Sequence, residues 1–202
     1  QEADIKIIEP NIIYFKKNNH IVESVLPGKH YLSNIAGAIA LCTLYELSIT
    51  EIIEAISKFP GVKRRLEYIG NYKDVKFYDD YGHHPTEIKA TISALKNHTP
   101  GKLFVIFQPH RFTRTRDNFE QLQNSLGEAD FAVVTDVYSA GEEPIPGISS
   151  KNFKGKNIKY IKSLRSIPIY IKDNISSGDN VLTLGAGDIT LLGPQILKYL
   201  ND

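Results

Sequence analysis

The sequence has little of several features that would mark a special class of protein. Its 202 residues include one cysteine, Cys42, which excludes an internal disulfide and is typical of a reducing compartment. No apolar run approaches the roughly 20 residues that a membrane-spanning helix needs, and residues 1–4 lack the charged-then-apolar pattern of a secretory signal. These absences indicate a globular protein of the cytoplasm. Cys42 lies in an apolar helical pattern, which favours a core position over a nucleophile.

An excess of charge of one sign is also absent. The sequence has 24 Lys and Arg against 23 Asp and Glu, a net charge of +1, and no obvious basic stripe, so nothing indicates nucleic-acid binding. A Gly-x-x-x-x-Gly-Lys-Ser/Thr loop, which cradles phosphates in P-loop proteins, does not occur. Because the chain opens without Met and inside an apparent strand, we expect it to be part of a longer protein.

Residues 1–67 predict a small region with strands first and helices after. Apolar runs predict strands at 5–8 and 12–15, and a third short run lies between residues 19 and 27. Helical spacing predicts a helix over 31–47, and a second helix starts at Thr50 and is ended by Pro60-Gly61. We place a boundary near residues 65–70, which gives domains 1–67 and 68–202.

Residues 68–202 alternate strand and helix. Apolar runs predict strands at 75–79, 103–107, 131–135, 158–161 and 181–184. The run at 103–107 is uninterrupted, as expected for a strand buried on both faces. Helices are predicted from Pro85 onward and at 116–126, 163–175 and 188–200. This alternation is typical of the α/β class, with a mainly parallel sheet covered by helices on both faces.

Unusual polar segments follow four of these strands directly. They are residues 79–85 (DDYGHHP), 108–116 (QPHRFTRTR), 136–143 (DVYSAGEE) and 185–188 (GAGD). The carboxyl ends of parallel strands meet at one edge of the sheet, and ligands bind there in such folds. We therefore expect these segments to form one site.

The second polar segment holds Arg111, Arg114 and Arg116 within six residues. Guanidinium groups grip carboxylates and phosphates with paired hydrogen bonds. With a helix predicted to begin near residue 116, these positive charges would lie at a helix N-terminus, where the helix dipole disfavours them. An anionic ligand is a better explanation for them than a solvated basic helix start.

The neighbouring aspartates Asp79 and Asp80 have two interpretations. With the histidines of the first two segments they could form a metal site. However, adjacent residues of a strand point to opposite faces and rarely share one ion. One aspartate could instead order a loop while the other binds a ribose or caps a turn. We expect no resident metal.

Three shorter motifs also leave alternatives open. Residues 185–187 (GAG) could form a phosphate-binding turn or only a tight turn. His30 and Asn34 share one helix face and could contact a nucleotide base or cap the helix. Residues 63–65 (KRR) could be functional or a charged linker.

Together these segments resemble the Mur ligase family. The resemblance is carried by residues 79–87 (DDYGHHPTE), 108–116, 138–142 (YSAGE) with 144–147 (PIPG), and 27–30 (PGKH) with Asn34 and Arg64-Arg65. It implies a C-terminal dinucleotide-binding-like (Rossmann-like) domain at 68–202. Before it, residues 1–67 would be the C-terminal remnant of a central ATP-binding domain.

The resemblance implies an ATP-dependent ligase of peptidoglycan precursor synthesis. In the branch that the loops resemble most, ATP, with Mg²⁺, phosphorylates the carboxylate of UDP-N-acetylmuramate, and L-alanine attacks the acyl phosphate. His30, Asn34, Arg65 and Asp80 would bind ATP. The residues that would face the muramoyl and alanine end are Tyr81, His83, His84, His110, Arg111, Thr113, Arg114, Ala140, Gly141 and Glu142. Without a phosphate loop, we expect this chain to be inactive by itself.

Other functions remain open at this stage. Within the family, a ligase that recycles murein tripeptide has related loops. A non-catalytic nucleotide- or anion-binding module needs only the arginine segment and the sheet edge. A metal-dependent hydrolase would need a bound zinc or manganese ion.

Overall fold

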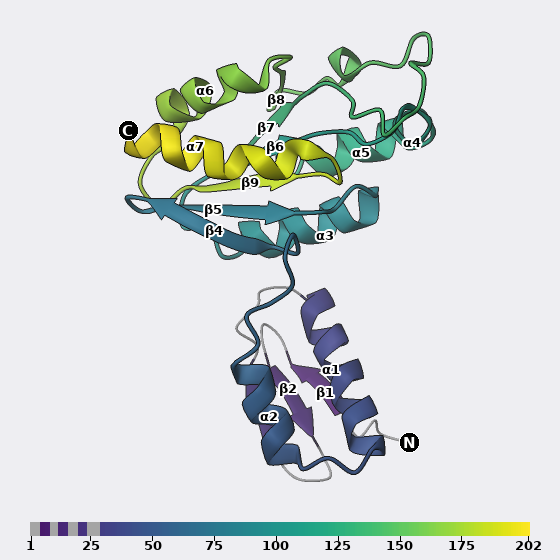
Figure 1. Ribbon diagram of the computed structural model, residues 1–202, viewed down its shortest axis with the longest axis vertical. Helices are drawn as coiled ribbons and strands as arrows, with labels where there is room; N and C mark the ends of the chain where they lie inside the picture. Colours follow the sequence, from purple (N-terminus) through teal and green to yellow (C-terminus); the bar gives the residue numbers. More distant parts are fainter. Residues whose placement is uncertain (1–4, 9–11, 16–19, 24–28) are drawn as a thin grey trace. The chain divides into compact units, whose positions relative to one another are not determined.

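A computed structural model of the chain describes residues 5–8, 12–15, 20–23 and 29–202 (Figure 1). It divides into two compact units, Gln1–Gly61 and Val62–Asp202. The division lies ahead of the boundary expected after residue 67. The physical reason is that residues 64–66 already bond to the second unit: Arg64 Nη2 donates to the Gly185 carbonyl over 2.6 Å, and the Leu66 amide donates to Asp80 over 2.8 Å.

The first unit combines a small sheet with two helices. Strands β1 (Ile5–Ile8), β2 (Ile12–Phe15) and β3 (His20–Glu23) pair antiparallel in that order, which confirms the strands predicted at 5–8 and 12–15. Helix α1 spans Lys29–Leu44 and α2 spans Ile49–Ser57. A core of Leu32, Ile39 and Ile52 joins the two helices, and Cys42 packs against it, partly buried. Residues 27 and 28 of the PGKH motif lie outside the described residues.

The second unit is built on one six-stranded sheet with the order β4-β5-β9-β6-β7-β8. Its strands are β4 (Glu67–Tyr72), β5 (Val75–Asp80), β6 (Leu103–Phe107), β7 (Phe131–Val134), β8 (Ile158–Tyr160) and β9 (Asn180–Leu184). All neighbours pair in parallel except β4, which is antiparallel to β5. The prediction of a mainly parallel sheet is confirmed.

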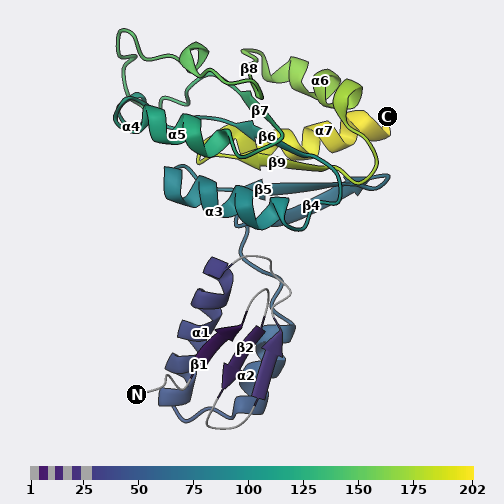
Figure 2. The same cartoon turned by 180° about the vertical axis from the view of Figure 1, so that it is seen from behind.

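Helices cover both faces of this sheet (Figures 1 and 2). Helices α3 (Pro85–Lys96) and α5 (Phe119–Leu126) lie together over one face. Helices α6 (Ile167–Asn174) and α7 (Leu192–Asn201) lie over the other. The α6 and α7 face buries Phe104, Ile106 and Val181 against Ile171 and Ile196. Every residue of β6 is buried, as its unbroken apolar run predicts.

The remaining helical segments are short. They are α4 (Phe112–Asp117) and the 3-10 turns η1 (Ser150–Asn152), η2 (Leu164–Ser166) and η3 (Asp188–Leu191). Pro85 opens α3 and Pro168 lies in the first turn of α6, where the missing proline N–H costs no helical hydrogen bond. Within the described residues, no helix has the length and apolarity to span a membrane.

Two sequence predictions about elements were wrong. The helix predicted over 116–126 is two helices, α4 and α5, which meet at Asn118. Residues 65–70 were assigned to a domain boundary and no strand was predicted there, but the edge strand β4 spans Glu67–Tyr72. Its residues are half-buried or exposed and show no regular alternation of apolar and polar side chains. An edge strand beside solvent needs little apolar surface.

Candidate functional site

The four polar segments meet at the carboxyl edge of the sheet, as predicted. The rings of His83, after β5, and His110, after β6, have centroids 6.1 Å apart. The His110 ring stacks on Tyr138, after β7, at 5.4 Å, and the two residues also form a backbone bridge. A Cβ on Gly187, after β9, would lie 2.7 Å from Cγ of Tyr138. All four loops therefore contribute to one surface.

The imidazole of His110 is held by Arg114. Arg114 Nη1 lies 3.1 Å from Nδ1 of His110. A guanidinium can only donate, so Nδ1 accepts and the proton of the neutral ring lies on Nε2. Partial burial, and then the positive charge of Arg114, lower the pKa of His110 below its ordinary value. At neutral pH, His110 is thus a neutral ring that offers an N–H donor from Nε2.

His83 has the opposite arrangement. Its Nδ1 lies 3.1 Å from the carbonyl of Tyr81, and a carbonyl can only accept, so Nδ1 carries the proton. In the neutral ring Nε2 then has the lone pair. His83 and His110 therefore supply one acceptor and one donor at the same edge of the sheet.

Arg111 and Glu142 correct the sequence argument about the arginines. Helix α4 begins at Phe112, so Arg111 precedes it, and Arg114 and Arg116 lie in its last turn, where the dipole favours positive charge. The carboxylate of Glu142 accepts from the Thr113 amide at 3.0 Å and the Thr113 hydroxyl at 2.6 Å, and it lies 4.0 Å from Arg111. The anion that the prediction required at this helix start is therefore supplied by another loop of the same chain.

The backbone around these groups is unusual. Arg111 has a φ of +71°, a conformation that costs energy for a residue with a side chain. Its amide donates to Tyr138 at 2.8 Å and its carbonyl accepts from the Thr115 hydroxyl at 2.7 Å. Ala140 and Gly141 form a turn with φ values of +51° and +86° that leads into Glu142. These contacts fix the backbone from which the half-exposed Arg111 side chain extends.

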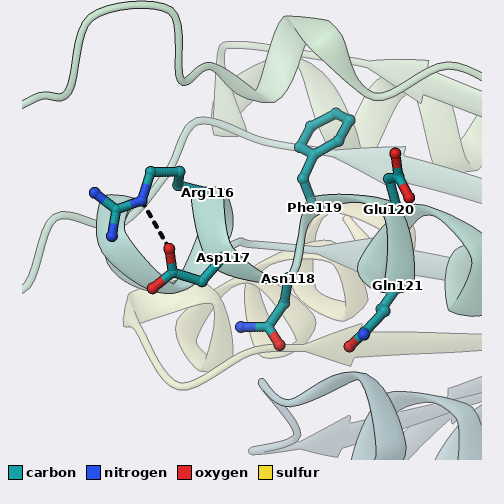
Figure 3. Close-up of a pocket in the computed structure, with 6 residues that line it drawn as sticks. All are labelled: Arg116, Asp117, Asn118, Phe119, Glu120 and Gln121. Carbon is teal, nitrogen blue, oxygen red and sulfur yellow. Dashed lines mark hydrogen bonds and ion pairs between the residues drawn. The ribbon is translucent and has the colours of Figure 1, made fainter.

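Arg116 differs from the other two arginines. Its Nε pairs with Asp117 at 2.7 Å. The pair borders a shallow hollow of about 330 Å³ between α4 and α5, lined by residues 116–121 (Figure 3). None of the other predicted site residues lines this hollow. Arg116 is thus paired with Asp117, whereas Arg114 is the arginine that contacts His110.

Asp79 and Asp80 are both buried and have different partners. Asp79 accepts hydrogen bonds from the hydroxyls of Thr183 at 2.6 Å and Thr190 at 2.7 Å. Asp80 accepts from the amides of Leu66 and Gly82, and its burial raises its pKa. Both carboxylates therefore order loops. With only 2% of Asp80 exposed, this conformation leaves little room for a ribose hydroxyl.

His84 and Glu87 organise the start of α3. His84 is the N-cap residue; its Nδ1 accepts from the Thr86 amide, while the Glu87 carboxylate accepts from the amides of His83 and His84. Partial burial by itself would raise the pKa of Glu87. The two amides and the nearby positive charges together lower this pKa by more than burial raises it, so the net shift is downward. The exposed His84 ring has a capping geometry, which is a role that the sequence analysis did not consider.

The predicted nucleotide contacts are divided between the units. His30 and Asn34 lie in the first two turns of α1, and Asn34 is exposed. Arg65 lies in the second unit, where its guanidinium is 3.8 Å from Glu87 and 6.0 Å from the Tyr81 ring centroid. Within the described residues, no group of three or more His, Cys, Asp or Glu could hold a metal ion.

Gln108 has a role that was not predicted from the sequence. It is buried; its Nε2 donates to Asp188 at 2.7 Å and its Oε1 accepts from the Ile189 amide at 3.2 Å. A Cβ on Gly185 would lie 2.7 Å from the Gln108 carbonyl. The turn at 185–187 is thus packed tightly against the loop after β6. The only signal in the sequence was the position of Gln108 directly after a buried strand.

Comparison with known families decides the classification. The model of the family described as "Mur ligase, glutamate ligase domain" matches residues 64–187, more than half of the chain. The chain belongs to the Mur ligase family. The match starts at Arg64 and includes the four polar segments of the carboxyl edge except for Asp188, the last residue of the fourth.

Individual Mur ligases show how far the similarity extends. The chain is 36% identical to the UDP-N-acetylmuramate–L-alanine ligase of Desulforamulus reducens, over 94% of this chain and 43% of the relative. It is 41% identical to the ligase of the same name from Syntrophomonas wolfei, over 89% of this chain and 40% of the relative. The chain thus spans about two-fifths of the length of these curated relatives.

Solved Mur ligase structures share the fold. The UDP-N-acetylmuramate–alanine ligase of Thermotoga maritima aligns with a TM-score of 0.75 at 26% identity, over 94% of this chain and 42% of that one. A MurF ligase from the same organism, solved in complex with ADP, aligns with a TM-score of 0.73 at 20% identity, over 98% and 46% of the two chains.

Proposed function

We propose that this chain is the C-terminal part of an ATP-dependent ligase that joins L-alanine to UDP-N-acetylmuramate. The observation that carries the proposal is the similarity of 36–41% identity, over most of the chain, to ligases of that name. The chain matches only about two-fifths of those ligases and has no Gly-x-x-x-x-Gly-Lys-Ser/Thr loop, so we expect no ligation by the chain alone. We place the reaction in the cytoplasm, where ATP is available.

The chemistry of the carboxyl edge supports this proposal. An acyl phosphate and the tetrahedral intermediate formed from it carry several negative charges. Arg111 and the Nε2–H of His110 are donors suited to such charge, and one well-placed donor can be worth about 3 kcal/mol in a transition state. The lone pair of His83 Nε2 is suited to accept a proton from the ammonium group of L-alanine, which leaves a neutral amine that can attack the acyl phosphate.

The three arginines have different proposed roles. Arg111 is half-exposed and its nearest carboxylate is 4.0 Å away, so it is the one best able to exchange Glu142 for a substrate carboxylate or phosphate. Arg114 orients His110. Arg116, which is paired with Asp117, is not assigned to the substrate.

Other residues would shape the pocket for the muramoyl and alanine end. Tyr81 lies in the loop of His83, Thr113 follows His110, and Ala140, Gly141 and Glu142 lie in the loop of Tyr138. We keep all five as proposed substrate-site residues. His84 and Asp80 support the site through capping and loop order.

We keep His30, Asn34 and Arg65 as proposed ATP-binding residues. In this proposal the first unit is the end of a central ATP-binding domain and the second unit is the Mur ligase C-terminal domain. The described residues do not fit a magnesium site, because the buried carboxylates of Asp79 and Asp80 are already bonded to protein groups. Any Mg²⁺ would be held by other groups.

The proposal is tested in the longer ligase that carries this chain. Release of ADP should require both UDP-N-acetylmuramate and L-alanine. Activity with murein tripeptide but not with L-alanine would assign the chain to the recycling ligase instead. Arg111→Ala should reduce kcat far more than it raises the KM for ATP, whereas Arg116→Ala, the matched control, should leave kcat nearly unchanged.

Calorimetry on the 202-residue chain separates the ligase from a self-sufficient nucleotide-binding module. The ligase predicts weak or undetectable ATP binding, since the chain has no phosphate-binding loop. A Kd below roughly 10 μM, equivalent to about 7 kcal/mol of contacts, would favour the module.

A further inference from the structure

Arg64 contacts several loops of the carboxyl edge at once, although it lies before the first strand of the sheet. Its Nη2 donates to the carbonyl of Gly185 at 2.6 Å and to that of Gly187 at 3.2 Å. Both carbonyls belong to the turn after β9, which packs on Gln108 and Tyr138. A single guanidinium nitrogen therefore holds this turn through two hydrogen bonds.

The same side chain forms an ion pair with Asp79. Arg64 Nε lies 3.4 Å from Asp79 Oδ2, and the two side chains are 26% and 2% exposed. The Nε atom is buried and has no hydrogen bond of good geometry, so the carboxylate compensates its charge. Asp79 is itself fixed by the hydroxyls of Thr183 and Thr190. The position of the guanidinium is thus determined by β5, β9 and η3 together.

Arg64 also fixes Tyr81 in two ways. The amide of Tyr81 donates to the carbonyl of Arg64 at 2.7 Å. The guanidinium carbon lies 4.8 Å from the centre of the Tyr81 ring, a cation–π distance. The Tyr81 ring is in edge contact with His83 at 5.3 Å, and the Tyr81 carbonyl accepts from His83 Nδ1. Arg64 is therefore linked to His83 through a single residue.

The backbone of this segment is held in a costly conformation. Arg64 and Leu66 have φ values of +58° and +47°, in the left-handed region that residues with a side chain rarely adopt. The Arg64 amide donates to Glu67 at 2.7 Å and the Leu66 amide donates to Asp80 at 2.8 Å. Such strain persists where the surroundings fix it, and it is found mainly at functional sites.

We propose that Arg64 is a positioning residue of the ligase site. It sets Tyr81 and the turn at 185–187 relative to each other, and so fixes the place of His83 beside His110. This inference rests on the proposed function. Only a guanidinium can serve all these partners, because its planar fork reaches two carbonyls, a carboxylate and an aromatic face, whereas a lysine ammonium is a single point charge.

The test compares Arg64→Lys with Arg165→Lys, the same exchange at an exposed arginine of η2. In the longer ligase, Arg64→Lys should lower kcat about 100-fold, the effect of a displacement of about 1 Å at a reacting group, and leave the KM for L-alanine within a few fold. In the 202-residue chain, the NMR amide signals of Tyr81 and Gly187 should shift while the melting temperature changes little. Arg165→Lys should change none of these.

Each outcome decides the proposal. An unchanged kcat in an active ligase, or unshifted Tyr81 and Gly187 signals, would overturn it. Loss of the folded state in both Arg64→Lys and Arg64→Gln would also overturn it, since Arg64 would then be needed for stability rather than for position. If the unmodified ligase does not use L-alanine, the proposed function fails, and the NMR shifts still decide whether Arg64 positions the loops.

Discussion

Arg114 Nη1 faces Nδ1 of His110 across 3.1 Å, so a permanent cation is the hydrogen-bond donor to a titratable ring. Protonation of Nδ1 would place two positive charges in contact. The positive charge of Arg114 therefore lowers the pKa of His110, in addition to the larger effect of burial.

The first prediction concerns this pair. Arg114→Met should raise the pKa of His110 toward its ordinary value of about 6.5, because the adjacent positive charge is removed. The pKa should remain below that value, since burial is the larger cause. NMR titration of the imidazole signals measures the change, with Arg165→Met as the control. A pKa that falls or stays constant in Arg114→Met would contradict the proposed contact.

The second prediction is a pH dependence of stability. The pKa of His110 is lower in the folded state than in the unfolded chain, so the unfolded state binds more protons between the two values. Stability should therefore rise with pH across that window and become level above about pH 6.5. His110→Gln should flatten this part of the curve in urea denaturation at a series of pH values. An identical slope in the two proteins would show that His110 is not held neutral by folding.

The third prediction concerns Glu142 and Thr113. The hydroxyl of Thr113 is the first cause of the lowered pKa of Glu142, followed by the Thr113 amide. Thr113→Val should raise the pKa of Glu142 toward about 4.3, while Thr86→Val, an exposed change on α3, should not. Carboxylate NMR signals report the titration. Ionised Glu142 stabilises the fold above the pKa that it has in the unfolded chain, and this stabilisation is lost as pH falls through its pKa in the folded state. Thr113→Val should therefore also make the free energy of unfolding depend less on pH in this range.

The fourth prediction concerns the buried carboxylate of Asp79. It accepts two hydroxyl hydrogen bonds and faces Arg64 at 3.4 Å. Hydrogen bonds to a charged group contribute about 1.5–3 kcal/mol, so Asp79→Asn should lower the free energy of unfolding of the second unit by about 3 kcal/mol. Denaturation followed by NMR signals of that unit gives the value. Asp173→Asn, an exposed change on α6, is the control, and an equally small effect in both variants would refute the assignment.

Much of the fold could be predicted because it depends on local patterns. The apolar run at 103–107 and the start of α3 at Pro85 are each encoded within a few neighbouring residues, and both are observed. The meeting of four loops at one edge also followed from the alternation of strands and helices. The edge strand β4 was not predicted because its residues do not show the regular alternation of apolar and polar side chains by which a strand is recognised.

The details of the site depend on contacts that no local pattern encodes. Glu142 reaches Thr113 from 29 positions away and Arg64 reaches Gly185 from 121 positions away. The sequence showed three arginines near a helix start and predicted an external anion. In the structure the carboxylate of Glu142 lies there. The Leu66 amide that donates to Asp80 likewise makes a contact that no local pattern encodes.

The central place of β9 has a consequence for biosynthesis. β9 lies between β5 and β6 and pairs with both, although it is the last of the six strands along the chain. While the ribosome is still translating the preceding residues, β5 and β6 have no common neighbour and expose unpaired backbone edges that can aggregate. The second unit is therefore expected to complete its sheet after translation of β9, and nascent chains stalled before residue 180 should depend on chaperones.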